Sequence, residues 1–165
     1  MHISEGMRFS FASSAILFCV VSILTILACH SSDSSRSGSR SDSSVPSDFH
    51  LVIGEGGGFT GEWNGNTVDS TGLIFSWRGA KAEQDAKQIS RLKTAQFHEL
   101  WQSIEEGRFF DIDSSGFGNM TEFMMVSANG KVHRVSWAKQ GPTASDLTPV
   151  QRIYNTCRGI IARDR

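Results

Sequence analysis

A serine-rich segment over residues 30–47 divides this chain into an apolar N-terminal stretch and a longer C-terminal part. More than half of the segment is serine, and Asp33, Arg36 and Arg40 are among its other residues. Such a composition cannot bury enough apolar surface to offset the entropy of ordering, so a solvated linker is predicted. A folded domain is therefore expected only over residues 48–165, a common size for a single domain.

The N-terminal stretch has the parts of a secretory signal. Arg8 precedes a long apolar run that ends at Ile26-Leu27-Ala28-Cys29. A positive flank, an apolar run and a small residue at the cut are typical of signal peptides. The last four residues resemble the lipobox of bacterial lipoproteins, in which the cysteine is acylated and begins the mature chain.

The lipobox resemblance implies a signal peptide over residues 1–28, and residues 29–47 then form the lipidated cysteine and its linker. Fatty acyl chains such as palmitate on Cys29 would make the membrane a partner and place the protein in the cell envelope. If the organism is Gram-negative, His30 in place of aspartate favours the outer membrane. An uncleaved membrane helix is the alternative, because the apolar run is close to the roughly 20 residues that span a bilayer. Translation could begin at Met1 or Met7.

Charge and cysteine content narrow the choice of partners and of stabilising bonds. The formal net charge is −1, so the chain lacks the excess of positive charge that is typical of proteins that bind nucleic acid. Of the three cysteines, Cys19 would leave with the signal and Cys29 would be acylated, so Cys157 remains alone. Without an intradomain disulfide, the domain must depend on its hydrophobic core.

Short β-prone runs and two amphipathic stretches predict an α+β fold. Strands are predicted at Phe49–Gly54, Phe59–Trp63, Thr67–Trp77, Ala86–Leu92, Met120–Val126 and Lys131–Trp137. The predicted turns are Asn64-Gly65, Ser70-Thr71-Gly72 and Asn129-Gly130, because glycine pairs of this kind favour hairpins.

Two helices are expected from apolar residues at a spacing of three and four. The first follows Thr94 as its N-cap and carries Phe97, Leu100, Trp101 and Ile104 on one face. The second follows Asp146 and carries a longer apolar stripe: Leu147, Val150, Ile153, Tyr154, Cys157, Ile160 and Ile161. We therefore predict an antiparallel sheet of four to five strands with two helices packed on one face.

No catalytic constellation is present in the sequence. His50, His98 and His133 are far apart and form no His-Glu-x-x-His motif, and there is no Cys-x-x-Cys pair. No serine has the glycine pattern of a nucleophile elbow. We therefore expect neither an enzyme nor a bound cofactor.

One stretch has the ligand spacing of a calcium loop. Asp111, Asp113, Ser115 and Glu122 lie at positions 1, 3, 5 and 12, and Gly116 lies at position 6. Gly118 replaces the apolar residue of position 8, and a strand is predicted after Glu122 instead of a helix. A polar loop between two elements is the more common explanation for such a stretch.

The order of elements with their short motifs resembles the emfourin family of bacterial inhibitors of thermolysin-like metallopeptidases. The resemblance covers roughly residues 50–162 and depends on a Gly-Gly-Phe-Ala-Gly-type opening and later α/β segments. The matching motifs are Gly57-Gly58-Phe59-Thr60-Gly61, Ile89–Leu92, the Phe97–Phe110 helix, Thr121-Glu122-Phe123-Met124, His133-Arg134-Val135 and the Leu147–Ile161 helix. The chain departs from the family by its lipoprotein signal with linker and by a longer insertion at Asn64–Asp85.

The emfourin resemblance implies that the domain binds a metallopeptidase, with Gly57, Gly58, Phe59, Thr60 and Gly61 near the contact. The same glycine-rich turn could instead be only a hairpin or bulge. Two other functions stay open: an envelope interaction or assembly module without inhibitory activity, and a calcium- or ligand-binding module centred on residues 111–122.

Overall fold

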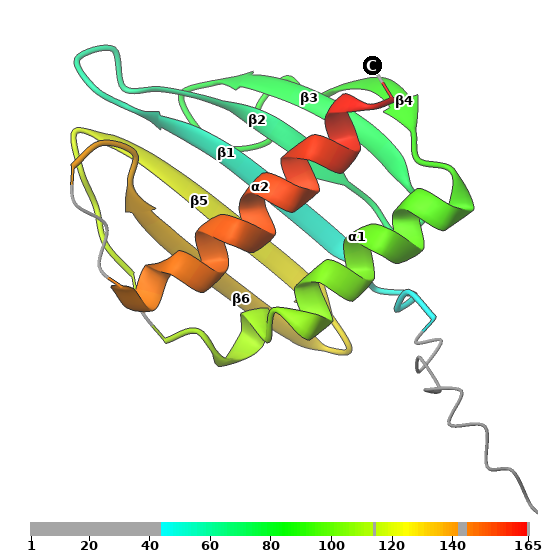
Figure 1. The fold of residues 1–165 in the computed structure, drawn as a ribbon. Coiled ribbons are helices and arrows are strands. Elements are labelled where there is room, and N and C mark those ends of the chain that lie inside the picture. Colours follow the sequence, from blue (N-terminus) through cyan, green and yellow to red (C-terminus); the bar gives the residue numbers. More distant parts are fainter. Residues whose placement is uncertain (1–43, 114, 142–144, 165) are drawn as a thin grey trace, which may run out of the picture. The chain divides into compact units, whose positions relative to one another are not determined.

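In the computed structural model of the protein, which describes residues 44–113, 115–141 and 145–164, two helices cover one face of an antiparallel sheet (Figure 1). The helices are α1 (Thr94–Glu106) and α2 (Thr148–Ala162), and 3-10 turns lie at η1 (Phe109–Asp111) and η2 (Ser145–Leu147). The strands are β1 (His50–Gly57), β2 (Glu62–Val68), β3 (Leu73–Gly79), β4 (Lys87–Arg91), β5 (Met120–Ala128) and β6 (Lys131–Ala138). The predicted α+β class is confirmed.

The sheet has six strands in the order β4-β3-β2-β1-β5-β6, so the prediction of four to five strands was too low. Every neighbouring pair is antiparallel, and β1 lies near the centre between β2 and β5. Each connection within the sheet is a hairpin except the one from β4 to β5, which contains α1 and η1. The end of β1 therefore lies beside the start of β5, with Gly57 opposite Met120.

The predicted turn at Asn64-Gly65 is wrong, because β2 runs straight through both residues. Gly65 lies opposite Gly54 of β1 and opposite Trp77 of β3. A Cβ atom on Gly65 would lie 2.4 Å from the Trp77 ring, and one on Gly54 would lie 2.5 Å from it. Glycine is needed here for the close approach of an indole ring, whereas the sequence suggested a turn.

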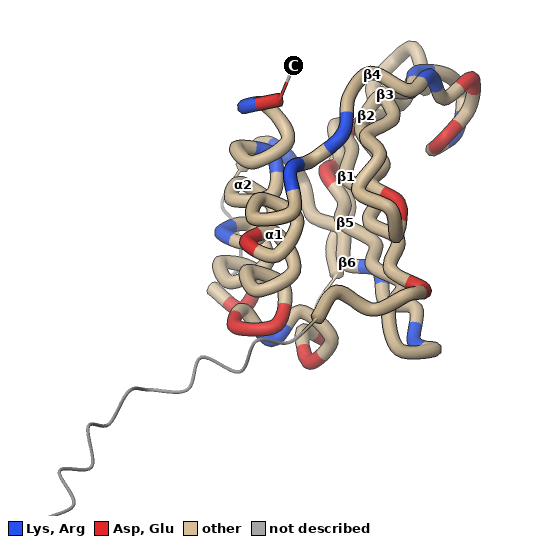
Figure 2. The backbone as a smooth tube through the Cα atoms, turned by 90° about the vertical axis from the view of Figure 1, so that its right-hand side faces the viewer, with Lys and Arg blue, Asp and Glu red and all other residues tan. Residues whose placement is uncertain are grey.

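The main core lies between the sheet and the helices (Figure 2). Both predicted helical stripes face it: Leu100, Trp101 and Ile104 of α1 are buried, and so is the longer stripe of α2. Phe97 is partly buried at the edge of the same core. Fully buried Leu51 and Met124 supply the sheet side of this layer, so the fold depends on apolar contact between two layers.

The helices begin slightly differently from the prediction. Lys93 is the N-cap of α1 and Thr94 is its first residue; the Gln96 side chain accepts a hydrogen bond from the Lys93 backbone N–H at 3.0 Å. This backward reach of the third helical residue satisfies the backbone N–H of the N-cap, as in a capping box. Asp146 lies in η2, and α2 starts only after that turn.

A smaller apolar cluster covers the sheet face that points away from the helices. Val52, Trp77 and Phe123 are buried there, and Trp63 packs against them. The Arg134 guanidinium lies 4.3 Å above the centre of the Phe123 ring. Apolar side chains are therefore buried on both faces of the central strands.

Candidate functional site

The glycine-rich turn between β1 and β2 presents Phe59 to solvent. Gly57, Gly58 and Gly61 have φ angles of 104°, 66° and 64°, a left-handed region that other residues rarely adopt. The Gly61 N–H donates to the Gly58 carbonyl at 3.3 Å, which closes a tight turn. Phe59, within that turn, has a fully exposed side chain.

A second loop lies against this turn and holds it in place. The Gly58 N–H donates to the Asn119 carbonyl oxygen at 2.6 Å, immediately before β5 begins. Phe117, two residues earlier, is 79% exposed. We call the turn at residues 57–61 together with the loop at residues 117–119 the loop surface; both segments lie at the same end of the sheet (Figure 1).

The chain that follows β6 supports the same end. The Lys139 N–H donates to the Met120 carbonyl at 2.8 Å, and the Lys139 ammonium lies 2.6 Å from a carboxylate oxygen of Glu55. The Lys139 contacts therefore join β1 and β5 to the chain after β6 beside the loop surface, while Phe59 and Phe117 remain in water. Tryptophan and tyrosine are enriched among the residues that dominate protein–protein binding energy, and an exposed phenylalanine likewise has a large apolar surface to bury.

The lipidation candidate Cys29 and the whole signal lie outside the described residues. In the part that the structure describes, neither helix is long and apolar enough to cross a membrane.

The side chains of the calcium-loop candidates make other contacts. Asp111 accepts a hydrogen bond from the Arg108 guanidinium at 2.8 Å. Glu122 accepts one from the Trp137 indole N–H at 2.9 Å and lies 3.8 Å from Arg158. The Ser115 hydroxyl lies 3.4 Å from the Ser136 N–H.

Within the described ranges, no group of three or more His, Cys, Asp or Glu side chains could hold a metal ion, and Asp113 belongs to no such group. Residue 114, inside the candidate loop, is not described.

Cys157 is fully buried between α1 and α2, where its sulfur lies 3.7 Å from the Ser103 hydroxyl. Burial raises the pKa of this thiol from 9.0 to about 12, although the Ser103 contact lowers it slightly. The thiol therefore stays protonated at neutral pH, and a protonated thiol is a poor nucleophile.

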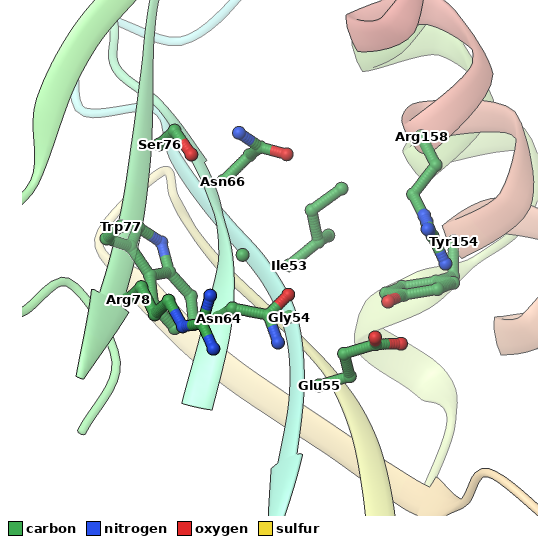
Figure 3. A pocket seen from close by; sticks show the side chains of 11 residues that line it. Ile53, Gly54, Glu55, Asn64, Asn66, Ser76, Trp77, Arg78, Tyr154 and Arg158 are labelled. Atoms are coloured by element: carbon green, nitrogen blue, oxygen red, sulfur yellow. The ribbon is translucent and has the colours of Figure 1, made fainter. Parts of the chain in front are cut away.

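A polar pocket that the sequence did not reveal opens between the sheet and α2 (Figure 3). Its volume is about 380 Å³. Asn64, Asn66, Ser76 and Arg78 line it from β2 and β3, and Glu55 from β1. Tyr154 and Arg158 of α2 line it from the helix side. The rest of the lining comes from the sheet: Ile53, Gly54, Gly65 and Trp77.

A sequence signal for this pocket existed in the alternation of β2, where Asn64 and Asn66 must point to the same face. The Asn64-Gly65 pair also fits a turn, and this second possibility obscures the alternation. Burial raises the pKa of Tyr154 above its usual value, and the nearby Arg158 charge acts in the opposite direction. Tyr154 is therefore a neutral hydroxyl at the pocket wall.

No protein-family model matches the chain, and no curated protein sequence is significantly similar to it.

Proposed function

We propose that this protein is an envelope lipoprotein whose domain binds a protein partner through the loop surface. The observation that carries the proposal is the fully exposed Phe59 side chain on a turn of three left-handed glycines. Burying a phenylalanine side chain that is otherwise in water contributes about 1.5–3 kcal/mol. Phe59 is therefore the anchor of the proposed contact.

The support beneath Phe59 favours binding. The Gly58–Asn119 hydrogen bond fixes the turn before a partner arrives, so less conformational entropy is lost on association. Glycines on both sides of Phe59 and Thr60 present no Cβ atoms, which lets a partner approach the backbone closely. Phe117 on the adjoining loop adds a second apolar side chain to the same end of the domain.

We further propose that the partner is an exported metallopeptidase of the thermolysin type. This finer proposal depends on the emfourin resemblance, whose glycine-rich motif coincides with the exposed turn. A turn that projects one aromatic residue has the convex shape needed to enter a concave cleft. The lipid on Cys29 and the serine-rich linker would let the tethered domain search near the membrane.

Inhibition of a thermolysin-like peptidase by the purified full-length chain in a mild detergent tests the proposal. We expect Phe59→Ala to raise the inhibition constant at least about tenfold, which is about 1.4 kcal/mol of binding free energy. Gly58→Trp should also weaken inhibition, because it adds a bulky group to the contact. Val132→Ala is the matched control, since Val132 is 70% exposed and lies near the other end of the sheet.

An unchanged inhibition constant for Phe59→Ala would contradict the role of Phe59, and absence of inhibition by the native chain would contradict the peptidase partner. Circular dichroism checks that each variant is folded, because tryptophan at position 58 must adopt a left-handed φ.

A further inference from the structure

The helix-facing side of the sheet changes from apolar to polar along β2 and β3. Val68 and Ile74 pair across these strands and are fully buried in the core. The next pair on the same face is Asn66 with Ser76, and the one after it is Asn64 with Arg78. Side chains of one face recur every second residue, so these two pairs form a continuous polar strip beside the core.

The polar strip continues into β1 and is faced by α2. Asn66 lies opposite Ile53, and Asn64 lies opposite Glu55. Figure 3 shows Tyr154 and Arg158 on α2 facing these residues across an open space. The strip and the helix therefore form the two walls of the polar pocket.

Each charged side chain that lines the polar pocket lies near an opposite charge outside it. Arg78 donates from Nε and Nη2 to the Glu62 carboxylate at 2.6 and 2.8 Å. Glu55 lies 2.6 Å from the Lys139 ammonium, and Arg158 lies 3.8 Å from Glu122. Because each lining charge has an opposite charge beside it, the pocket offers little net attraction to an ion.

Amide and hydroxyl groups then dominate what a ligand would meet. Asn64 is exposed and offers amide donors and an acceptor, whereas Asn66 is 8% exposed and already donates from Nδ2 to the Phe75 carbonyl at 3.2 Å. The half-buried Ser76 hydroxyl can donate and accept. Most small-molecule pockets are lined mainly by apolar and aromatic side chains, whereas polar side chains dominate the lining of this one. Here Ile53 is 2% exposed and Tyr154 is 2% exposed, so they present little surface to a ligand.

We propose that the polar pocket binds a neutral saccharide of one or two rings. Neighbouring hydroxyls on a sugar ring donate and accept hydrogen bonds in the way that amide and hydroxyl side chains require. The volume of about 380 Å³ is in the lower part of the range of small-molecule sites. This site is separate from the loop surface, so the two proposals can fail independently.

Titration of the isotope-labelled full-length chain with maltose and with N,N′-diacetylchitobiose, followed by NMR, tests the proposal. The chain is held in a zwitterionic detergent, because a detergent with a sugar headgroup would compete for the site. We expect saturable shifts of the Asn64 and Asn66 side-chain amides with at least one of these disaccharides. Asn64→Ala and Arg158→Ala should each weaken that binding at least about threefold, since each removes direct hydrogen-bonding groups.

Arg152→Ala is the matched control, because Arg152 is an exposed arginine on the same helix that does not line the pocket. Asn64 and Arg158 are also exposed, so their replacement should leave the amide spectrum dispersed. The proposal would be overturned by the absence of a saturable shift at either asparagine, or by equal weakening of binding in Arg152→Ala and Arg158→Ala. Glucose 6-phosphate is titrated as a charged sugar, and tighter binding of it than of the neutral disaccharides would also overturn the proposal.

Discussion

The backbone N–H of Gly58 donates to the carbonyl oxygen of Asn119 at 2.6 Å and so joins two loops that are far apart in the sequence. One loop carries Phe59 and the other carries Phe117, both largely or fully exposed. The hydrogen bond continues the β1–β5 ladder by one residue beyond the Gly57–Met120 pair. The regular sheet therefore sets the position of the proposed docking surface.

We expect Gly58→Ala to reduce the free energy of unfolding by about 1–2 kcal/mol. A left-handed φ is costly for any residue with a Cβ, and the added atom would lie 3.1 Å from the Met120 sulfur. Gly116→Ala is the control, since that position has open space and no positive φ, and should change stability by less than about 0.5 kcal/mol. Equal effects of the two variants in urea denaturation would contradict the geometry of the turn.

Residues 46–165 should fold alone, without metal or disulfide, because the core lies between the sheet and two helices within this range. Trp101→Ala in this fragment should cost roughly 3–5 kcal/mol, since its ring is 2% exposed and packs edge-on against Phe49. Phe117→Ala should cost less than about 0.5 kcal/mol. Chemical denaturation measures both, and a loss below about 1 kcal/mol for Trp101→Ala would contradict the packing of α1.

Alkaline pH should destabilise the 46–165 fragment partly through Cys157. Burial raises the pKa of this thiol from 9.0 to about 12, so above pH 9 the unfolded chain releases its proton and the folded chain keeps it. The stabilisation is complete below pH 9 and is lost as the pH rises toward 12, by up to about 1.4 kcal/mol per pH unit. Cys157→Ala should show a shallower loss between pH 9 and 10 in urea denaturation, and an identical slope would contradict this role.

The membrane anchor is tested through Cys29. Metabolic labelling with a palmitate analogue should mark the native protein, and the label should be absent from Cys29→Ser, because the lipobox prediction makes this thiol the acyl acceptor. Cys19→Ser is the control and should stay labelled. A protein that keeps its label in Cys29→Ser, or that retains residues 1–28 by mass spectrometry, would contradict the lipoprotein proposal.

Calcium should give no saturable heat below millimolar concentration in calorimetric titration of the 46–165 fragment. Asp111 is already engaged by Arg108, and Glu122 by Trp137. Calcium binding would need to replace these contacts as well as organise several oxygen ligands. Micromolar binding that is lost in the double variant Asp111→Asn, Glu122→Gln would reverse this prediction.

The two helices were predictable because their information is local. A stripe at a spacing of three and four residues identifies a buried helix face without any knowledge of its neighbours. The same holds for Asn129-Gly130, whose φ angles of 54° and 72° are those of a tight hairpin turn. The two helices and this hairpin turn are therefore predicted correctly from residues that lie close together in the sequence.

The polar pocket was not predictable in the same way, because it depends on pairing between strands. Asn66 and Ser76 are ten positions apart in the sequence, and only the β2–β3 register makes them neighbours. Gly65 is also ambiguous in the sequence. Its lack of a side chain leaves space for the Trp77 ring, but a glycine that follows asparagine equally predicts a turn. Such ambiguity arises wherever one residue type meets two different physical needs.

The docking proposal is tested most directly by hydrogen–deuterium exchange of the full-length chain, alone and mixed with a thermolysin-like peptidase. The peptidase is inactivated by a Glu-to-Gln change in its His-Glu-x-x-His motif, so that it binds without cleaving. We expect protection at residues 57–61 and 117–119, with no change at the Asn129-Gly130 turn at the opposite end of the sheet. Protection confined to that opposite turn, or no protection anywhere in the domain, would contradict docking through the loop surface.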